Sequence, residues 1–560
     1  MKKYTLLLIM TFFSYYSIYS QSSFIRKWGT MMQNPIFGSN FVVAVNPING
    51  NLYYVKNYLE IIEHNINSPQ EKSIYKIIPR SGGAIIQFIT FDSKGNIIIT
   101  ARDPAPLMLK INLQGTVLFS LRPGSFSQNT THITLDKFDN IYFIQRINKN
   151  NVLTGNPFQN TGDQSSIINE QDVITKLDKD GKHVWSTFYT KDHSYIRSIV
   201  AGDDGLYVYG EHMASNSKSN YFGTPDSFQE YATGLETGVG NNAKNVFLSK
   251  FNFNGAREWS TYFAIDRSLI PYSEVLNYYG GLTVINNEPY ILTKHEIRPI
   301  MSRNPTTSGA FLTQQVSDSQ FDITVSKFSS KGKREWTTFV YDGEAINRSY
   351  DTNELYISGT TISSNTFMPS LTTNDGYQKS FGGGRTDSYS FSLSPDGKNM
   401  NYSTLYGFTG TDFGVTIPTF KGYYTIGYSF INPSENSPFV TDDASYKTLL
   451  LRPGIAGYYG SYISYFMKKS LGTSDNYNLK NISFSVFPNP TVDILNIRST
   501  EILPEGTLFR IYDVVGKTVL IEKTKAVEVN QINVSMLNTG TYILQITNAS
   551  SNKSFKFIKK

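Results

Sequence analysis

Residues 177–188 read LDKDGKHVWSTF, residues 251–262 read FNFNGAREWSTY, and residues 328–339 read FSSKGKREWTTF. In each stretch an apolar residue is followed four positions later by a glycine, and a tryptophan stands four positions after that. The flanking residues alternate between apolar and polar, which is typical of β-strands. A glycine between two such strands, beside Asp, Asn or Lys, predicts a tight hairpin turn. The three stretches are therefore copies of one repeated β-hairpin.

Weaker copies of this hairpin and a second recurring signal extend the repeat along the chain. The weaker copies are Ile111–Gly115–Phe119, Ile78–Gly82–Ile86 and Leu393–Gly397–Tyr402. A turn followed by a short apolar strand precedes the hairpins, and a further strand, such as residues 132–135, 196–200 or 282–285, precedes that turn. This second signal occurs at residues 51–55, 96–100, 140–144, 205–209, 288–292, 354–358 and 422–426. Each repeat therefore predicts four consecutive strands.

Four-stranded antiparallel units repeated about seven times predict the blades of a β-propeller. The last unit, near residues 415–466, has only three strands, whereas residues 24–30 form a spare aromatic strand at the N-terminal side. Pairing these two segments would close a ring and remove exposed sheet edges, which favours a propeller over a solenoid or stacked sandwiches. We expect an all-β fold with seven four-stranded blades, the N-terminal strand closing the last one. Six or eight blades are the alternatives, because the unit around Gly82 is short.

Long insertions separate the second and third strands of five units, and in a propeller such loops emerge on one face. They span about residues 146–170, 211–243, 294–320, 360–385 and 429–457, are rich in Asn, Ser, Thr and Gly, and include Tyr221-Phe222 as candidate aromatic tips. Long loops on a rigid scaffold usually carry binding functions. We therefore predict ligand binding on this face, the alternative being loops that only cover the ring.

Three of these loops share a sequence pattern, seen in residues 224–229 (TPDSFQ), 307–312 (TSGAFL) and 374–378 (NDGYQ). Together with the turn glycines and the Trp-Ser-Thr-aromatic strands, the pattern makes residues 24–470 resemble the bacterial β-propeller repeat family. The resemblance implies the fold, and it leaves the molecular function open.

Composition excludes several classes of function. The net charge is only +6 over 560 residues, with no dense Lys/Arg cluster, so a nucleic-acid-binding surface is not predicted. The sequence contains no cysteine, which excludes disulfides, thiol catalysis, thiolate metal sites and a lipoprotein anchor.

The N-terminus has the pattern of a secretory signal peptide. Lys2 and Lys3 precede an uncharged apolar run, and Ser20 provides a small residue before Gln21. A membrane anchor is the alternative, but the run is short for a spanning helix and no stop-transfer cluster follows it. We expect residues 1–20 to be removed and the mature protein to have no transmembrane segment.

A search for catalytic or metal-binding motifs finds one weak candidate. His212 and His295 occupy the same repeat position in neighbouring units, next to Glu211 and Glu296. Equivalent positions of two blades are expected to be too far apart for metal–ligand bonds of ~2 Å, so solvated side chains are the favoured interpretation. No cofactor is predicted, and the absence of a recognisable catalytic set favours a binding protein over an enzyme.

The C-terminal residues form a separate pattern. Residues 471–483 read as a polar linker, and residues 484–560 alternate as a small β-sandwich of about seven strands. Motifs occur there in a fixed order, and their residues are Pro488, Asn489, Pro490, Gly516, Lys517, Gly540, Tyr542 and Lys559. This order resembles the type A C-terminal sorting domain of the type IX (Por) secretion system. The resemblance implies a Gram-negative bacterium of the Bacteroidetes type and export through the periplasm by the type IX machinery.

The combined expectation is an exported protein, either released or attached to surface lipopolysaccharide. Its propeller, residues 21–470, would bind an extracellular glycan or protein through the loop-bearing face. An enzyme acting on polysaccharide or peptide, with its site at the mouth of the ring, is the alternative function. A purely structural role in a surface layer is the third possibility.

Overall fold

The protein, seen in a computed structural model, separates into two compact units, Met1–Met467 and Lys468–Lys560. Residues 1–22, which include the expected signal peptide, lie outside the described part of the chain, and no helix within that part is long and apolar enough to cross a membrane. The structure describes residues 23–32, 42–80, 83–103, 105–122, 132–153, 155, 158–213, 219–232, 244–263, 281–296, 305–314, 321–341, 343–349, 352–362, 371–430, 437–447, 459–469, 482–500, 503, 507–523, 529–547 and 552–560.

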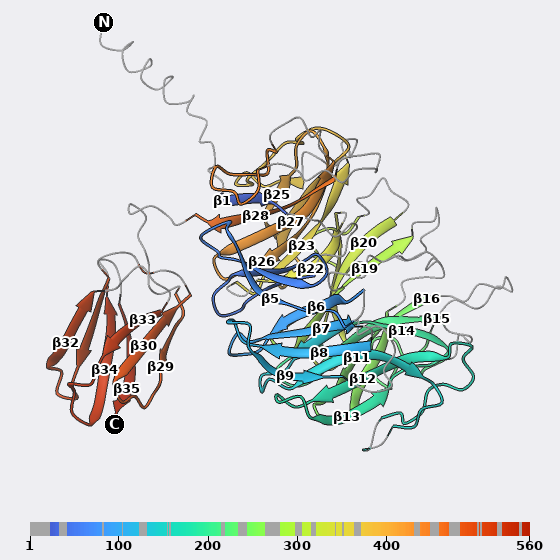
Figure 1. The fold of residues 1–560 in the computed structure, drawn as a ribbon, viewed down its shortest axis with the longest axis horizontal. Helices are drawn as coiled ribbons and strands as arrows, with labels where there is room; N and C mark the ends of the chain where they lie inside the picture. The colour runs from blue at the N-terminus through green and yellow to red at the C-terminus, as the bar shows by residue number, and fades with distance from the viewer. Residues whose placement is uncertain are drawn as a thin grey trace, which may run out of the picture. The chain divides into compact units, whose positions relative to one another are not determined.

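The first compact unit consists of antiparallel sheets that follow one another along the chain, and we number them 1 to 7 (Figure 1). Sheets 1 to 3 contain β2 (Val43–Val45), β3 (Leu52–Lys56), β4 (Glu60–His64) and β5 (Glu71–Lys76); β6 (Ile85–Phe91), β7 (Ile97–Asp103), β8 (Ala105–Ile111) and β9 (Val117–Leu121); and β10 (His132–Leu135), β11 (Ile141–Asn148), β12 (Glu170–Leu177) and β13 (His183–Phe188). Sheets 4 and 5 contain β14 (His193–Ala201), β15 (Leu206–Met213), β16 (Lys244–Phe251) and β17 (Arg257–Phe263), and β18 (Leu282–Ile285), β19 (Glu288–Glu296), β20 (Phe321–Phe328) and β21 (Arg334–Val340).

The last two sheets are joined to each other and to the N-terminal strand. Sheet 6 contains β22 (Gly343–Arg348), β23 (Leu355–Ile362), β24 (Thr386–Leu393) and β25 (Met400–Tyr406), and sheet 7 contains β26 (Thr411–Pro418), β27 (Gly422–Phe430), β28 (Tyr459–Lys468) and β1 (Phe24–Met31). A single parallel pair, Thr386 with Thr411, connects the two sheets. The predicted pairing of the N-terminal strand with the last sheet is present, because β1 is hydrogen-bonded to β28 (Figure 1).

The repeated hairpin identified in the sequence forms the third and fourth strands of a sheet. In β12–β13, β16–β17 and β20–β21 the register shifts by one residue beside the predicted turn. Gly181, Gly255 and Gly332 have φ angles of 87°, 87° and 74°, a region that favours glycine. The prediction of a hairpin turn at these positions is therefore confirmed.

One proposed copy of the hairpin, Ile78–Gly82–Ile86, is wrong. Ile78 is 87% exposed and lies after β5, and Ile86 belongs to β6, the first strand of the next sheet. The third and fourth strands of sheet 1 are instead β4 and β5, joined by residues 65–70. The alternation of apolar residues around Ile86 correctly predicts a strand there, but alternation alone does not show with which neighbouring strand it pairs.

Each tryptophan of the repeat lies on the turn glycine of the next sheet. A Cβ atom at Gly255, Gly332 or Gly397 would come within 2.6–3.2 Å of the ring of Trp185, Trp259 or Trp336, respectively. Each indole Nε1 also donates to a carbonyl of that turn, at 3.1 Å for Phe253, 2.7 Å for Ser330 and 3.2 Å for Pro395. These glycines are required both by the turn conformation and by the approach of the indole ring.

The same contact joins the last sheet to the first. Trp28, in β1, is fully buried, and its Nε1 donates to the carbonyl of Ile66 in the β4–β5 connection, at 3.0 Å. The Tyr424 hydroxyl in β27 donates to the carbonyl of Gly50 in sheet 1, at 2.9 Å. The first strands of sheets 1 to 7 also contact one another in chain order, from β2 to β26. Sheet 7 is therefore packed against both sheet 6 and sheet 1.

The second compact unit has its own hydrophobic core. Leu495, Ile511, Ile532 and Leu544 are fully buried between two sheets, β29–β30–β33 and β32–β31–β34–β35. The strands are β29 (Phe484–Phe487), β30 (Ile494–Ser499), β31 (Leu508–Tyr512), β32 (Thr518–Lys523), β33 (Val529–Asn533), β34 (Gly540–Thr547) and β35 (Asn552–Lys559).

Candidate functional site

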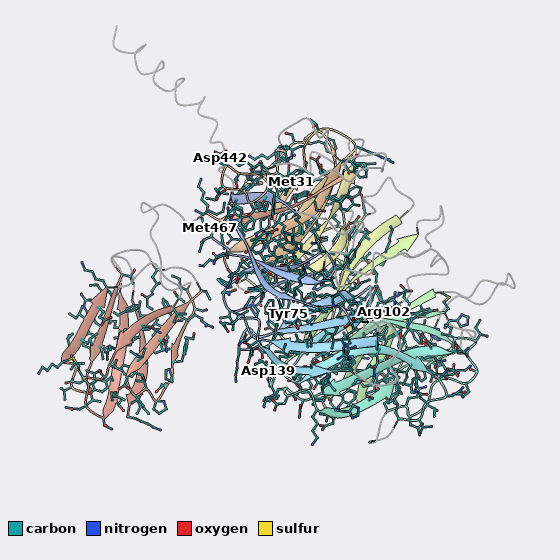
Figure 2. The ribbon with its side chains drawn as sticks, in the orientation of Figure 1. Met31, Tyr75, Arg102, Asp139, Asp442 and Met467 are labelled. Carbon is teal, nitrogen blue, oxygen red and sulfur yellow. The ribbon has the colours of Figure 1, made fainter. Side chains whose placement is uncertain are left out.

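The connections between strands appear at two ends of sheets 1 to 7. The end with the first-to-second and third-to-fourth connections is called the turn face here, and the end with the second-to-third connections is called the loop face. Asp139, in the β10–β11 connection, belongs to the turn face, whereas Arg102, near the end of β7, belongs to the loop face (Figure 2).

On the loop face, each long insertion runs back along the outer strand of its own sheet. The carbonyls of Gln159, Gln229 and Leu312 accept hydrogen bonds from the backbone nitrogens of Phe188, Tyr262 and Phe339, at 3.0, 2.9 and 3.1 Å. Sheets 6 and 7 repeat the contact, from Leu405 to Gln378 and from Met31 to Tyr446, both at 3.0 Å. The sequence pattern shared by the loops is therefore the segment that covers an outer sheet edge.

The loop aromatics predicted as tips are not exposed tips. Phe222 is fully buried and stacks on Phe247, with ring centroids 3.9 Å apart. The Tyr221 hydroxyl donates to the side-chain oxygen of Gln159 in the neighbouring loop. The sequence could not show this, because a Tyr-Phe pair in a polar loop has the same pattern whether it is exposed or packed beneath the loop.

His212 and His295 lie on β15 and β19, at equivalent register positions opposite Asn245 and Asp322. The His212 side chain is fully buried; its Nδ1 is 3.0 Å from the Tyr262 hydroxyl and its Nε2 is 3.4 Å from Asp192. The side chain of His295 lies outside the described residues. In the part of the chain that the structure describes, no group of three or more His, Cys, Asp or Glu side chains is arranged to hold a metal ion.

Buried histidines make stability depend on pH. Burial lowers the pKa of His212 to about 4, although Asp192 beside it acts in the opposite direction, and burial lowers the pKa of His64 and His132 to about 4 as well. A folded-state pKa below that of the unfolded chain means that the stabilisation is complete above pH ~6.5 and is lost as the pH falls through 4.

We expect the free energy of unfolding to fall between pH 6.5 and pH 4, and His212→Gln to remove up to about 3 kcal/mol of that decrease. Denaturant titrations of the wild-type protein and the variant at several pH values measure the free energy of unfolding. His183→Gln, at an exposed position of β13, is the matched control. An equally steep decrease in the His212→Gln variant would contradict this assignment.

A cavity of about 280 Å³ opens on the turn face. Sheets 1 to 6 all contribute lining residues, from the ends of their first strands or from the connections that follow them, from Pro47 in sheet 1 to Arg348 at the end of β22 in sheet 6. Because six sheets contribute, the cavity lies where their first strands converge. We call it the turn-face recess.

Two carboxylates of the recess already have hydrogen-bond or ion-pair partners in their own turns and on neighbouring strands of their sheets. Asp92 accepts from the backbone and side chain of Asn96 and pairs with Lys110 at 2.9 Å. Although burial raises the pKa of Asp92, these hydrogen bonds and the lysine hold it below its ordinary value. Asp136 accepts from Asn140 in the same way, and from the hydroxyl of Tyr142 at 2.9 Å. An Asp four residues before an Asn in such a turn was the available sequence signal for the recess, and it was missed.

Other recess residues connect neighbouring sheets. Asp139 accepts from both the backbone nitrogen and the hydroxyl of Ser93, each at 2.7 Å. The Asn287 side-chain oxygen accepts from the backbone nitrogen of Asp203 at 2.7 Å, and Arg348 donates to the carbonyl of Val284 at 3.2 Å. These contacts hold the recess walls in place.

A second polar group lies between sheets 3 and 4, toward the loop face. Arg146 and Arg197 flank the ring of Tyr195 at 4.8 and 5.3 Å, and they pair with Asp172 and Glu211 at 2.9 and 3.2 Å. Burial raises the pKa of Asp172, and Arg146 acts against that shift. Each charge therefore has an opposite partner, and the group is best explained as a polar connection between the two sheets.

The sorting-motif residues link the two ends of the C-terminal unit. The Asn489 side chain accepts from the backbone nitrogen of Ile558 at 2.9 Å and donates to the carbonyl of Lys556 at 3.2 Å. Other motif residues shape turns. Gly516, with φ of 83°, lies in the turn before Lys517, and Tyr542, two residues after Gly540, donates to the carbonyl of Asn538 at 2.9 Å. Pro488 and Pro490 flank Asn489, and Lys559 is buried in the last strand.

Three solved structures illustrate the low similarity of the chain to known proteins. BamB from Moraxella catarrhalis is 10% identical, with a TM-score of 0.35, covering 81% of this chain and 99% of its own. A quinohemoprotein alcohol dehydrogenase from Pseudomonas putida HK5 is 8% identical, with a TM-score of 0.37, covering 84% and 79%. PorZ, a surface component of the type-IX secretion system of Porphyromonas gingivalis, is 10% identical, with a TM-score of 0.18, covering 93% and 81%. Likeness at this level carries no argument about function.

No curated protein matches the chain. A family model does match its C-terminal part, over residues 485–560, and that family is described as the secretion system C-terminal sorting domain. The range agrees with the motifs that begin at Pro488 and end at Lys559. Residues 485–560 are therefore a C-terminal sorting domain of the Por (type IX) secretion system, carried by a secreted all-β protein whose sheets are of the propeller-blade kind.

Proposed function

We propose that sheets 1 to 7 close into a seven-bladed β-propeller spanning residues 21–470. A linker, residues 471–483, would then lead to a β-sandwich sorting domain at residues 484–560. The contact of Trp28 with Ile66 and that of Tyr424 with Gly50 support closure, because both join sheet 7 to sheet 1.

The expected route begins with a signal peptide, residues 1–20, which directs the chain to the periplasm. The sorting domain then engages the type IX machinery, and the protein is released or attached to surface lipopolysaccharide. The match of residues 485–560 to the sorting family supports this route.

The molecular function that the geometry supports best is binding of an extracellular ligand, a glycan or a protein, on the loop face. The observation that carries it is the combination of fixed loops and exposed apolar side chains. Ile167 is 81% exposed, Val152 67% and Tyr231 49%, and all three stand in insertions that are fastened to outer strands. A rigid loop that presents apolar groups loses little conformational entropy when a partner binds.

The test uses the mature full-length protein with immobilised polysaccharides and bacterial or host surface proteins, and follows retention and product release in the same tubes. We expect retention on at least one of them without products. Ile167→Ser combined with Tyr231→Ala should reduce retention about tenfold, as loss of two central contacts does in many interfaces.

Leu118→Ser, which changes an exposed apolar residue of the outer strand β9, is the matched control and should retain binding. Normal retention of the double variant would show that the binding surface does not include these two loop positions. Release of products from any substrate would replace the binding function with an enzymatic one.

A further inference from the structure

The turn-face recess lies at the opposite end of the sheets from the proposed loop-face surface, so it constitutes a separate candidate site. Its volume of about 280 Å³ is just below the roughly 300–1,000 Å³ of pockets that enclose drug-sized ligands. A recess of this size accepts one small ring or a short side group of a larger molecule.

The accessible groups of the recess balance in charge. Asp92 and Asp136 are buried and occupied by their own turns. The polar groups that remain accessible are two cations, two carboxylates, two amides and the Ser93 hydroxyl, which donates to Asp139: Lys137, Arg348, Asp139, Asp203, Asn286, Asn287 and Ser93. An ion would be repelled by half of these charges, whereas a neutral ligand with many hydroxyl groups can use donors and acceptors together.

The recess wall still has carboxylate oxygens that can accept hydrogen bonds from such a ligand. The carboxylate of the exposed residue Asp203 has no hydrogen-bond partner among the described residues, because its contact with Asn287 is made through the backbone nitrogen. Asp139 is fixed by Ser93 through two hydrogen bonds, and a carboxylate can accept about four. The acceptors are thus positioned before any ligand arrives, which reduces the entropy lost on binding.

Phe138 stands in the same turn as the lining residues Lys137 and Asp139 and is 62% exposed, but its side chain is not among those that line the recess. It is therefore a suitable position for a control variant near the recess.

We propose that the turn-face recess binds a neutral sugar unit, with Asp139, Asp203 and Asn287 as hydrogen-bonding groups. The site is independent of the proposed loop-face function.

The experiment titrates the mature full-length protein calorimetrically with neutral trisaccharides (maltotriose, cellotriose, mannotriose and chitotriose) and with acidic trigalacturonate, at low and high salt. We expect at least one neutral sugar to bind with an affinity that salt does not change, and trigalacturonate not to bind. Asp203→Ala should weaken binding about tenfold. Phe138→Ala, which changes an exposed side chain that does not line the recess, should bind normally.

Leu118→Ser, at an exposed position of the outer strand β9, is the control and should leave trisaccharide binding unchanged. If the loop-face double variant Ile167→Ser with Tyr231→Ala loses sugar binding while Asp203→Ala keeps it, the recess proposal fails and the loop-face function stands. Binding of none of the neutral sugars, or binding of trigalacturonate that weakens with salt, also overturns the recess proposal. Loss of retention on every polysaccharide and protein in the earlier assay, with sugar binding intact, would instead overturn the loop-face function.

Discussion

Deletion of residues 484–560 should abolish appearance of the protein outside the cell. The deleted segment contains the whole matched sorting domain and has its own core, and sheets 1 to 7 belong to a separate compact unit. The shortened protein should therefore fold and remain in the periplasm. Fractionation of the producing cells, together with protease treatment of intact cells, measures the outcome.

Two controls separate loss of sorting from loss of folding. A chain that lacks residues 471–480 but keeps residues 484–560 should still be exported, because the sorting domain is intact. A melting curve of the truncated protein should retain the unfolding transition of sheets 1 to 7. Export of the truncated protein at the normal level would refute the role assigned to the C-terminal domain.

Trp28→Ala should lower the free energy of unfolding by about 3–5 kcal/mol, as truncation of a fully buried tryptophan does. The indole is 0% exposed, its ring lies 5.5 Å from that of His64 and 5.9 Å from that of Tyr424, and its Nε1 donates to Ile66. These partners belong to sheets 1 and 7, so the variant weakens the contact between these two sheets. Denaturant unfolding followed by fluorescence measures the loss.

Trp28→Phe keeps most of the apolar contact and should cost less than the alanine variant. Hydrogen exchange distinguishes a local weakening from a general one. In Trp28→Ala, amides of β1, β3 and β28 should exchange faster, whereas those of β19 and β20, in sheet 5, should not change until global unfolding. An equal acceleration of amide exchange in sheet 5 would show that Trp28 does not specifically stabilise the contact between sheets 1 and 7.

Local sequence patterns predicted most of the strands, because hairpin glycines and alternating side chains depend on neighbours in the chain. Strands 132–135 and 282–285 were predicted with the bounds that β10 and β18 have. The same reasoning failed at Ile78–Gly82–Ile86, where a strand-like alternation belongs to β6 rather than to the end of sheet 1. Pairing partners are set by contacts between distant segments, which alternation does not encode.

The candidate sites were less predictable than the strands. The insertions lie between the second and third strands, as predicted, but the sequence does not predict that the pattern they share covers the outer strands. The turn-face recess was not foreseen. Its residues, such as Asp139, Asp203 and Asn287, come from three separate turns, each of which explains its own Asp or Asn locally.

The repeat, the hairpin turns, the lack of cysteine and the sorting domain can all be predicted from the amino-acid sequence, because each depends on short segments or on composition. The contact of Trp28 with Ile66, the burial of Phe222 and the return of the loops along the outer strands are seen only in the folded chain. The recess that six sheets line is likewise seen only there. These features arise from packing between segments up to several hundred residues apart, and packing energy depends on three-dimensional proximity rather than on local order.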